Sequence, residues 1–305
     1  MSVVAAETAG TPGQFAITDR EFRRFRLLVS QQTGISLGDS KRQLVCSRLA
    51  RRLRHYGYAT FSQYYEHLME RDPDGAELLR MIDAITTNKT DFLRESHHFD
   101  FLRSELLGPL VAGARAGAPR SLRLWSAGCS SGEEPYSIAL TIVDALPSAW
   151  TRDVKILASD IDTQVLAVAM EGVYPLDRVA VVPAALREKY FLRGRGGREG
   201  FVRVRPDVRQ LVRFRRINLR EDAWPIRAPF DSIFCRNVII YFDRALQQRL
   251  VARFVDLLKP GGYLFLGHSE SLLGMRVGLR CLGKTVYQKV DEPVVTTAGP
   301  GAGRA

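Results

Sequence analysis

Apolar residues along this chain follow two different periods, and the change between them divides the sequence into two parts. From about residue 15 to 85 they recur every three or four positions, which is the period of an amphipathic helix. Phe22 and Phe25 begin this pattern, a capping residue stands at Thr18 or Asp19, and Gly34 ends the first helix. Three further helices are predicted over residues 40–56, 61–71 and 74–85. The first part is therefore expected to be an all-helical domain.

From about residue 120 onward, short strand-like runs alternate with helical patterns. Strands joined by helical crossovers run parallel, so this pattern predicts a parallel sheet covered by helices, an α/β fold. The last two predicted strands have no helix between them, which predicts an antiparallel edge. The predicted strands are 122–126, 154–159, 230–235, 263–267 and 284–289, and the predicted helices are 133–146, 163–171 and 244–258.

One stretch departs from the alternation of strands and helices. Phe201, Arg203 and Arg205 alternate with valines, and residues 211–217 continue in a similar style after a turn at Pro206. This pattern predicts a small antiparallel β-insertion at about residues 194–217 with an exposed, basic face. The expected layout is a disordered leader (1–14), a helical domain (15–85), a linker and connecting helix (86–119), an α/β domain (120–290) and a disordered tail (291–305).

The charge balance narrows the range of partners. The 305 residues include 44 Lys and Arg against 33 Asp and Glu, a formal net charge of +11. This balance favours a nucleic acid, an anionic membrane surface or an acidic protein, and charge alone does not choose among them. The four cysteines form no C-x-x-C pair, the five histidines form no H-E-x-x-H motif, and no run of about 18 apolar residues occurs. We therefore expect a reduced, cytoplasmic protein with no metal site and no membrane insertion.

A loop of small residues follows the first predicted strand, and residues 125–137 read W-S-A-G-C-S-S-G-E-E-P-Y-S. A strand, a glycine-containing loop and a helix form the front of a nucleotide-type site at the carboxyl edge of a sheet. The spacing matches neither G-x-G-x-x-G nor the P-loop, and Glu133 and Glu134 would repel a pyrophosphate. A ligand with a positive centre and no phosphate fits better. The alternative is a tight turn that only packs the helix on the sheet.

Two more polar stretches stand at strand ends, where α/β proteins bind ligands. Asp160 ends the second strand, where a carboxylate can accept from both ribose hydroxyls, and a cap or turn role is the alternative. Asp162 is expected to cap the next helix. Arg236 and Asn237 follow a later apolar strand. Tyr241 comes four residues after them, and its alternative role is a half-buried aromatic residue whose hydroxyl is satisfied.

The joint between the two parts is also polar, and residues 86–95 read T-T-N-K-T-D-F-L-R-E without any periodicity. A linker at a domain boundary often contributes to a cleft. Arg94 in this linker can bind a carboxylate through two parallel hydrogen bonds. Taken alone, it would be an ordinary surface arginine.

Together these motifs resemble those of the CheR family, the chemotaxis receptor methyltransferases. T-T-N-x-T-x-F-x-R-E, W-S-A-x-x-S-x-G-E-E-P-Y-S, A-S-D-I-D-T and F-C-R-N-V-x-I-Y-F-D occur in this order, followed by L-K-P-G-G and G-H-S-E. The likeness covers about residues 15–290. It implies an N-terminal all-helical domain and a Rossmann-like S-adenosylmethionine-dependent methyltransferase domain, with a small β-subdomain inserted into the latter.

The resemblance also implies which residues meet the cofactor. Arg94 would bind the methionine carboxylate of S-adenosylmethionine, with Asn88 and Thr90 beside it. One of Glu133 and Glu134 would face the cofactor, and we expect Glu134. The other implied positions follow later strands: Asp160 at the ribose, Asn218 and Leu219 along the adenine, Arg236 and Asn237 beside the sulfonium and substrate cleft, and Tyr241 at the methyl-transfer site.

The implied reaction esterifies glutamate side chains of bacterial chemoreceptors and leaves S-adenosylhomocysteine. A glutamate carboxylate is ionised at neutral pH and needs no general base, which agrees with the lack of an obvious His–Asp pair. The basic helix around Arg48, Arg51 and Arg52 would dock an acidic receptor bundle, although a solvated basic face is the alternative. The β-insertion resembles the piece that tethers some family members to a receptor's C-terminal peptide. We expect a monomer.

Three other functions compete with this interpretation. A nucleic-acid methyltransferase would explain the charge, but the stretch 234–242 lacks the N/D-P-P-Y/F type of signature. A non-catalytic receptor-binding protein on the same fold would be expected to have lost Arg94, Asp160 or Tyr241, and all three are present. A dehydrogenase would need the phosphate-binding glycine pattern, which is missing.

Overall fold

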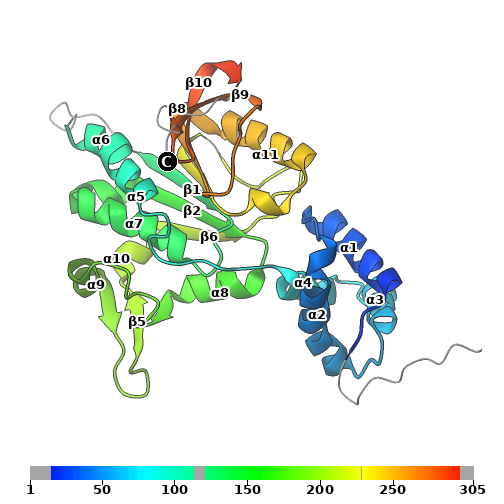
Figure 1. Cartoon of the computed structure of the whole chain (residues 1–305). Coiled ribbons are helices and arrows are strands. Elements are labelled where there is room, and N and C mark those ends of the chain that lie inside the picture. Colours follow the sequence, from blue (N-terminus) through cyan, green and yellow to red (C-terminus); the bar gives the residue numbers. More distant parts are fainter. Residues whose placement is uncertain (1–14, 113–120, 228, 296–305) are drawn as a thin grey trace, which may run out of the picture. The chain divides into compact units, whose positions relative to one another are not determined.

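The computed structural model of the chain describes residues 15–112, 121–227 and 229–295. It divides into two compact units, residues 1–87 and 88–305 (Figure 1). This division falls just after the predicted end of the helical domain. The predicted disordered leader, residues 1–14, lies outside the described residues, as do 113–120 of the linker and 296–305 of the tail. Residues 291–295, which we predict to be disordered, instead belong to the last strand.

The described part of the N-terminal unit contains four α-helices, as the periodicity predicts. The first begins at a capping box, in which the Glu21 carboxylate accepts from the Thr18 amide at 2.9 Å and the Glu21 amide donates to the Thr18 hydroxyl. Gly34, with a φ of 78°, ends it. The helices are α1 (Asp19–Thr33), α2 (Arg42–Tyr56), α3 (Phe61–Glu70) and α4 (Ala76–Ile85).

A buried carboxylate ties three of these helices together. Glu77 of α4 is 2% exposed, and the Nε of Arg52 in α2 donates to its Oε1 at 2.7 Å. The hydroxyls of Tyr56 and Tyr64 donate to the same carboxylate at 2.9 and 2.8 Å. Burial alone would raise the pKa of Glu77, but the hydrogen bonds from Arg52 and the two tyrosines lower it below its ordinary value. These contacts of Glu77 with Arg52, Tyr56 and Tyr64, which we call the Glu77 hub, therefore stabilise this unit in addition to its apolar core.

Two of the three arginines predicted to dock a receptor are partly exposed and have partners within their own unit. Arg52 binds Glu77, and Nη1 of Arg48 donates to the backbone oxygens of Ile85 and Thr86, each at 2.6 Å. Arg48 thereby satisfies carbonyl groups at the end of α4, which have no partner within the helix. Arg51 is exposed.

Seven strands form the main sheet of the second unit, in the order β6-β2-β1-β7-β8-β10-β9. The first five in this order run parallel, and β10 pairs antiparallel with both β8 and β9. The predicted parallel sheet with an antiparallel edge is confirmed, whereas β9 has no counterpart among the predicted strands. The strands are β1 (Leu122–Ala127), β2 (Val154–Asp160), β6 (Val212–Arg216), β7 (Phe230–Cys235), β8 (Leu258–Leu266), β9 (Arg276–Gly283) and β10 (Val286–Val295).

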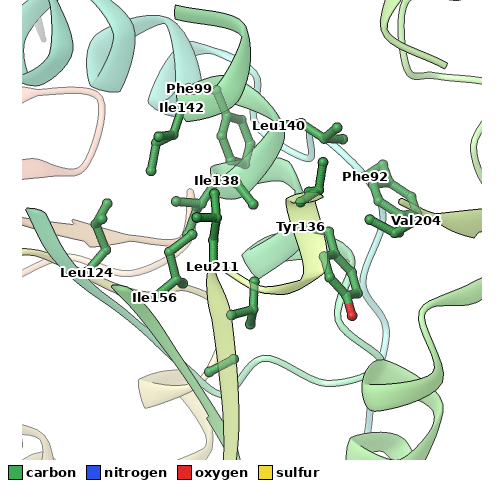
Figure 2. Close-up of a cluster of buried hydrophobic side chains, with 14 of the residues drawn as sticks. Phe92, Phe99, Leu124, Tyr136, Ile138, Leu140, Ile142, Ile156, Val204 and Leu211 are labelled. Carbon is green, nitrogen blue, oxygen red and sulfur yellow. The ribbon is translucent and has the colours of Figure 1, made fainter. Parts of the chain in front are cut away.

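The main apolar core lies between this sheet and α7, as Figure 2 shows. Leu124 of β1 and Ile156 of β2 point toward Ile138 and Ile142 of α7, and all four side chains are fully buried. Helix α7 is buried continuously from Glu133 to Ile142. The helices of this unit include α5 (His97–Phe101), α6 (Gly108–Ala112), α7 (Glu133–Ala145), α8 (Thr163–Glu171) and α11 (Arg244–Leu257).

The β-insertion exists, but its extent differs from the prediction. Three antiparallel strands form a separate small sheet in the order β3-β5-β4. Residues 211–217, predicted as part of this sheet, instead contribute β6, which pairs parallel with β2 in the main sheet. We call residues 173–204 the β-subdomain. It contains β3 (Val173–Pro175), α9 (Ala184–Tyr190), β4 (Phe191–Arg193) and β5 (Phe201–Val204), and α10 (Pro206–Arg209) connects it to β6.

The reason for this error is physical. Val212 is buried and Phe214 is partly buried, whereas Arg213 and Arg215 are exposed. An edge strand with one solvated face shows the same alternation as a hairpin strand. The alternation therefore predicts a strand but not the sheet that receives it.

Candidate active site

The register of the parallel strands brings the predicted motifs to one edge of the main sheet. Ala127 at the end of β1 lies opposite Ser159 of β2, and Asp160 lies opposite Arg216 at the end of β6. On the other side of β1, Ser126 lies opposite Phe234 of β7. The segments that follow these strands therefore share the carboxyl edge, where open α/β sheets bind ligands.

The loop after β1 is fixed by its close contacts. The amides of Gly128 and Cys129 donate to the backbone oxygen of Ser159 at 2.8 and 2.9 Å. Gly128 has a φ of 87°, and a Cβ there would lie 2.3 Å from Cγ2 of Val238 in the loop after β7. The glycine thus lets two loops of the carboxyl edge pack against each other.

Asp160 is nearly buried and oriented by the backbone. Its Oδ2 accepts from the Ser130 amide at 2.8 Å and its Oδ1 from the Asp162 amide at 3.0 Å. Burial raises the pKa of Asp160 above its ordinary value, although these amides oppose the rise. Each oxygen keeps a second lone pair, so a ribose hydroxyl can still be bound. Asp162 caps α8 as predicted, because its side chain accepts from the Gln164 amide at 2.8 Å.

The linker residues predicted to meet the cofactor lie beside this loop. The side-chain amide of Asn88 donates to Asp162 at 2.6 Å, and the backbone oxygen of Asn88 accepts from the Ser130 hydroxyl. Arg94 donates to the Lys89 carbonyl at 3.0 Å and has no ion pair with a described residue. Its partly exposed guanidinium can therefore bind a carboxylate of a ligand. Thr90 is held through its backbone oxygen, which accepts from Arg178.

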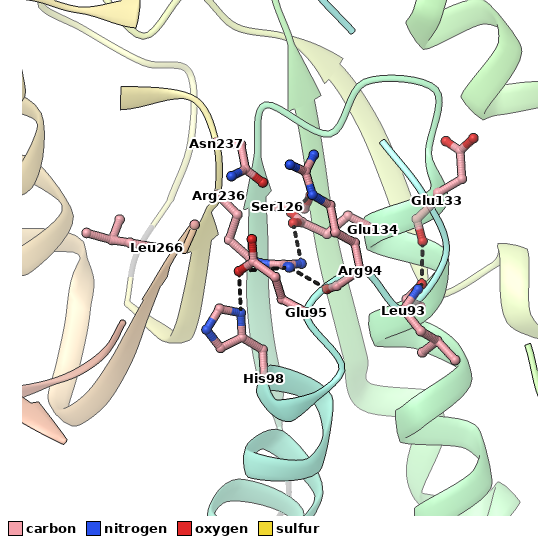
Figure 3. A network of polar contacts seen from close by, with 12 residues as sticks. Leu93, Arg94, Glu95, His98, Ser126, Glu133, Glu134, Arg236, Asn237 and Leu266 are labelled. Carbon is pink, nitrogen blue, oxygen red and sulfur yellow. Dashed lines mark hydrogen bonds and ion pairs between the residues drawn. The ribbon is translucent and has the colours of Figure 1, made fainter. Parts of the chain in front are cut away.

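Arg236 is the centre of a buried ion network (Figure 3). Its Nη1 lies 3.1 Å from Glu134 and its Nη2 lies 3.3 Å from Glu95, while Nη2 also donates to the backbone oxygen of Arg94. Glu134 accepts a further hydrogen bond from the Ser126 hydroxyl at 2.7 Å. Burial raises the pKa of Glu134 even though Arg236 opposes the rise. Arg236, predicted to border the sulfonium, thus joins the linker to α7.

A residue with no predicted role, Glu270, shapes the loop after β7. Its carboxylate accepts from the amides of Asn237, Val238, Ile240 and Gly267 at 2.7, 2.8, 3.2 and 2.6 Å. The side chain is 2% exposed. Asn237 has a left-handed φ of 59°, which few residues adopt without support. The signal in the sequence is the G-H-S-E motif, where a charged residue follows a buried strand.

The remaining predicted residues also lie at this edge. Asn218 and Leu219 follow β6, and the Ile217 amide just before them donates to the Asp160 backbone oxygen at 3.0 Å. Both side chains are nearly buried. Tyr241 ends a short 3₁₀ turn, is partly exposed, and has no hydrogen bond from its hydroxyl to a described residue. Its hydroxyl is therefore available to a bound molecule.

Sequence reasoning leaves two contributors to the site unrecognised, because they lie in the β-subdomain. The Tyr174 hydroxyl donates to the Ser131 backbone oxygen at 2.7 Å. Arg178 forms a close ion pair with Glu133, which is 1% exposed. Neither residue belongs to a motif, so no sequence signal marks them.

One group of metal-ligand residue types lies next to the Arg236 network. Ligand atoms of Glu95, His97 and His98 lie within 4.8 Å of one another. Glu95 pairs with Arg236, and a ring nitrogen of each histidine lies within 3.3 Å of the Lys284 carbonyl oxygen. A cation there would displace these contacts and would lie close to the positive guanidinium. That the protein has no metal site stays a prediction.

Residues 88–288 match the family model described as CheR methyltransferase, SAM binding domain, and residues 20–86 match CheR methyltransferase, all-alpha domain. The chain belongs to the CheR methyltransferase family. The two matched ranges meet at the boundary between the two structural units. The resemblance seen in the motifs is therefore confirmed, together with the fold and the cofactor class, S-adenosylmethionine, that it implies.

Individual CheR relatives match along most of their length. Chemotaxis protein methyltransferase 2 of Pseudomonas aeruginosa is 48% identical over 274 residues, which cover 90% of this chain and 94% of that protein. The chemotaxis protein methyltransferases of Salmonella typhimurium and Escherichia coli are 44% and 43% identical over 277 residues, and 90% of this chain is covered in each case. The coverage of those two proteins is 91% and 92%.

The donor set of this CheR chain fits S-adenosylmethionine. The ligand carries a carboxylate, a ribose and a positively charged sulfur, and it has no phosphate. Arg94 can bind the carboxylate and Asp160 the ribose, whereas Glu133 and Glu134 at the start of α7 are each paired with an arginine.

Proposed function

We propose that this CheR protein transfers the methyl group of S-adenosylmethionine to glutamate side chains of bacterial chemoreceptors, forming glutamyl methyl esters and S-adenosylhomocysteine. The named activity of its relatives supports the chemotaxis role. The observation that carries the acceptor assignment is that the described residues offer no histidine–carboxylate pair able to act as a general base. Among the described residues, the histidine–carboxylate pair is His98 with Glu95. His98 is fully buried, and burial followed by the charge of Arg236 lowers its pKa to about 3.

An acceptor that is already ionised avoids the need for such a base. A glutamate carboxylate, with an ordinary pKa of about 4.3, meets this condition at neutral pH. The cofactor supplies an electrophilic methyl group on a positively charged sulfur. Transfer forms the ester C–O bond and breaks the C–S bond, and no proton has to move.

The task of the protein is therefore alignment. We expect Arg94 to hold the methionine carboxylate, Asp160 the ribose, and Tyr241 the acceptor. A fixed cation would stabilise the carboxylate that must lose its charge, and Arg236 is kept from that role by Glu134 and Glu95. The neutral hydroxyl of Tyr241 can orient the acceptor without this penalty. Asn88, Thr90, Asn218, Leu219 and Asn237 complete the proposed cofactor site.

The receptor surface is proposed to be acidic and to contact α2. Because Arg48 and Arg52 have internal partners, we assign the docking role chiefly to Arg51 and its exposed neighbours Lys41 and Arg54. The exposed Arg203 of the β-subdomain and Arg205, which directly follows it, form a second basic surface that suits a receptor peptide. We propose a cytoplasmic monomer; no helix among the described residues is long and apolar enough to cross a membrane.

The test is incubation with methyl-labelled S-adenosylmethionine and a chemoreceptor cytoplasmic fragment, followed by mild base. Label released as volatile methanol identifies a carboxyl methyl ester. A receptor fragment whose acceptor glutamates are replaced by alanine is the matched control and should take up no label. Label that survives base treatment would contradict the ester assignment, and label transferred to DNA or RNA instead would support a nucleic-acid methyltransferase.

A further inference from the structure

We call residues 128–132, the loop between β1 and α7, the cofactor loop. The β-subdomain contacts this loop through a buried tyrosine. Tyr174 of β3 is 2% exposed, and its hydroxyl donates to the Ser131 backbone oxygen at 2.7 Å. Its ring packs edge-on against Phe92 of the linker, with centroids 5.0 Å apart. One side chain of the β-subdomain thus touches both the loop and the linker that carry proposed cofactor contacts.

Gly132 shows how closely this tyrosine approaches the loop. A Cβ at Gly132 would lie 2.8 Å from the Tyr174 hydroxyl and 2.9 Å from Cβ of Ala169 in α8. The residue also has a φ of 97°, so a side chain is disfavoured on two grounds. The turn before α7 therefore packs directly against Tyr174 of β3.

Arg178 makes a second, independent connection. It follows β3 and forms a close ion pair with Glu133, the first residue of α7. Its Nη2 also donates to the Thr90 backbone oxygen at 2.8 Å, and its Nη1 lies 3.5 Å from Asp91. One guanidinium from the β-subdomain thereby joins the start of α7 to the linker.

We propose that Tyr174 and Arg178 are positioning residues for S-adenosylmethionine, so that the β-subdomain holds the cofactor loop in its binding shape. The inference rests on the assignment of the loop after β1 and the linker to the cofactor site. It gives the β-subdomain a role in cofactor affinity that is separate from any contact with a receptor. Because binding energies are linked reciprocally, a molecule that distorts the β-subdomain changes cofactor affinity, and the cofactor stiffens the β-subdomain.

The chain offers a matched control for Tyr174. The Tyr190 hydroxyl, also in the β-subdomain, donates to the Val143 backbone oxygen at 3.0 Å. Both tyrosines are buried, and each donates to a backbone oxygen outside the β-subdomain. Tyr190, however, contacts the far end of α7, away from the cofactor loop. Tyr174→Phe and Tyr190→Phe therefore remove the same kind of hydrogen bond at the two ends of one helix.

The experiment measures the affinity of the full chain for S-adenosylhomocysteine by isothermal titration calorimetry, with the thermal midpoint of each variant. We expect Tyr174→Phe to weaken binding by about fivefold to tenfold, the effect of one lost hydrogen bond, and Tyr190→Phe to leave it unchanged. Both should lower the midpoint by a similar amount. At saturating S-adenosylmethionine, Tyr174→Phe should retain its kcat while KM for the cofactor rises.

Arg178 provides the second arm. Arg178→Lys keeps a positive charge for Glu133 and should weaken S-adenosylhomocysteine binding less than Arg178→Met. Unchanged affinity in Tyr174→Phe and Arg178→Met would overturn the proposal, as would an equal loss in Tyr190→Phe, which would show a general structural effect. Failure of the unsubstituted protein to bind would overturn the cofactor-site assignment too, whereas methylation of a different acceptor would leave the coupling intact.

Discussion

The guanidinium of Arg236 lies 3.1 Å from the carboxylate of Glu134, in a pair whose side chains are 2% and 9% exposed. Removing only the cation would leave the buried Glu134 and the partly buried Glu95 without their counter-charge. We expect Arg236→Met to lower the free energy of unfolding by about 3 kcal/mol or more, measured by urea denaturation. Arg249→Met, which removes an exposed pair at 4.0 Å with Asp222, should change it little. Equal effects of the two substitutions would contradict the network.

The Glu77 hub predicts a specific pH dependence of the N-terminal unit. Because its pKa is lowered on folding, the stability it contributes is complete above the ordinary carboxyl pKa and is lost as pH falls through the folded value. The thermal midpoint should therefore stay level from neutral pH to about pH 5 and drop as the pH falls below about 4.3, the ordinary glutamate pKa. Glu77→Gln should lower the midpoint at pH 7 and flatten this dependence. Glu70→Gln, at an exposed position of α3, should leave both unchanged.

Gly267 predicts a steric requirement in the loop after β7. A Cβ at this position would lie 2.3 Å from Nδ2 and 2.7 Å from the backbone nitrogen of Asn237. The second contact can be relieved only by moving the backbone. Gly267→Ala should shift Asn237 and Tyr241, and reduce kcat/KM by about tenfold or more, as small displacements of aligned groups do. Gly38→Ala is the control, since its Cβ would have ordinary contact at 3.9 Å. Full activity of Gly267→Ala would remove this loop from the proposed mechanism.

Tyr241 can be tested without disturbing the fold, because its hydroxyl has no hydrogen bond to a described residue. Tyr241→Phe should lower kcat by about tenfold or more, the usual cost of losing a positioned hydrogen-bonding group, while S-adenosylhomocysteine affinity stays the same. Single-turnover methylation and calorimetry separate the two quantities. Full kcat with unchanged cofactor affinity would exclude the orienting role.

Receptor docking should depend on the outward arginine of α2. Arg51→Glu is expected to raise KM for the receptor fragment several-fold, with an effect that shrinks as salt increases, and to leave cofactor affinity unchanged. Glu66→Arg, which changes an exposed charge on α3, is the control. If Arg51→Glu has no effect on KM at low salt, the docking surface lies elsewhere.

Local signals in the sequence place the helices well. Thr18, Gly34 and Gly172 each form a cap with residues a few positions away, and the helices they bound begin or end where predicted. Strand partners are non-local, and this is why the alternation alone places β6 in the wrong sheet. The strand itself is where the pattern puts it.

The candidate site shows the same limit. The carboxyl-edge rule places Asp160 and Arg236 correctly at one edge, because it needs only the end of each strand. Glu133 and Glu134 are neighbours in the sequence, yet one binds Arg178, 45 residues away, and the other Arg236, 102 residues away. No local pattern distinguishes them. Arg48 and Arg52, which have partners in α4 or at its end, are likewise indistinguishable from Arg51 until α4 is packed against α2.

The amide of Val204 donates to the backbone oxygen of Gly172 at 2.9 Å, so the chain enters and leaves the β-subdomain at adjacent points. Because its two ends lie side by side, the β-subdomain can be exchanged between relatives without any movement of α8 or β6. Tyr174 and Arg178 lie close to the first residue of the β-subdomain. A graft that starts at residue 172 would replace both residues. A graft that starts after residue 178 would keep both contacts of the host and change only the rest of the β-subdomain.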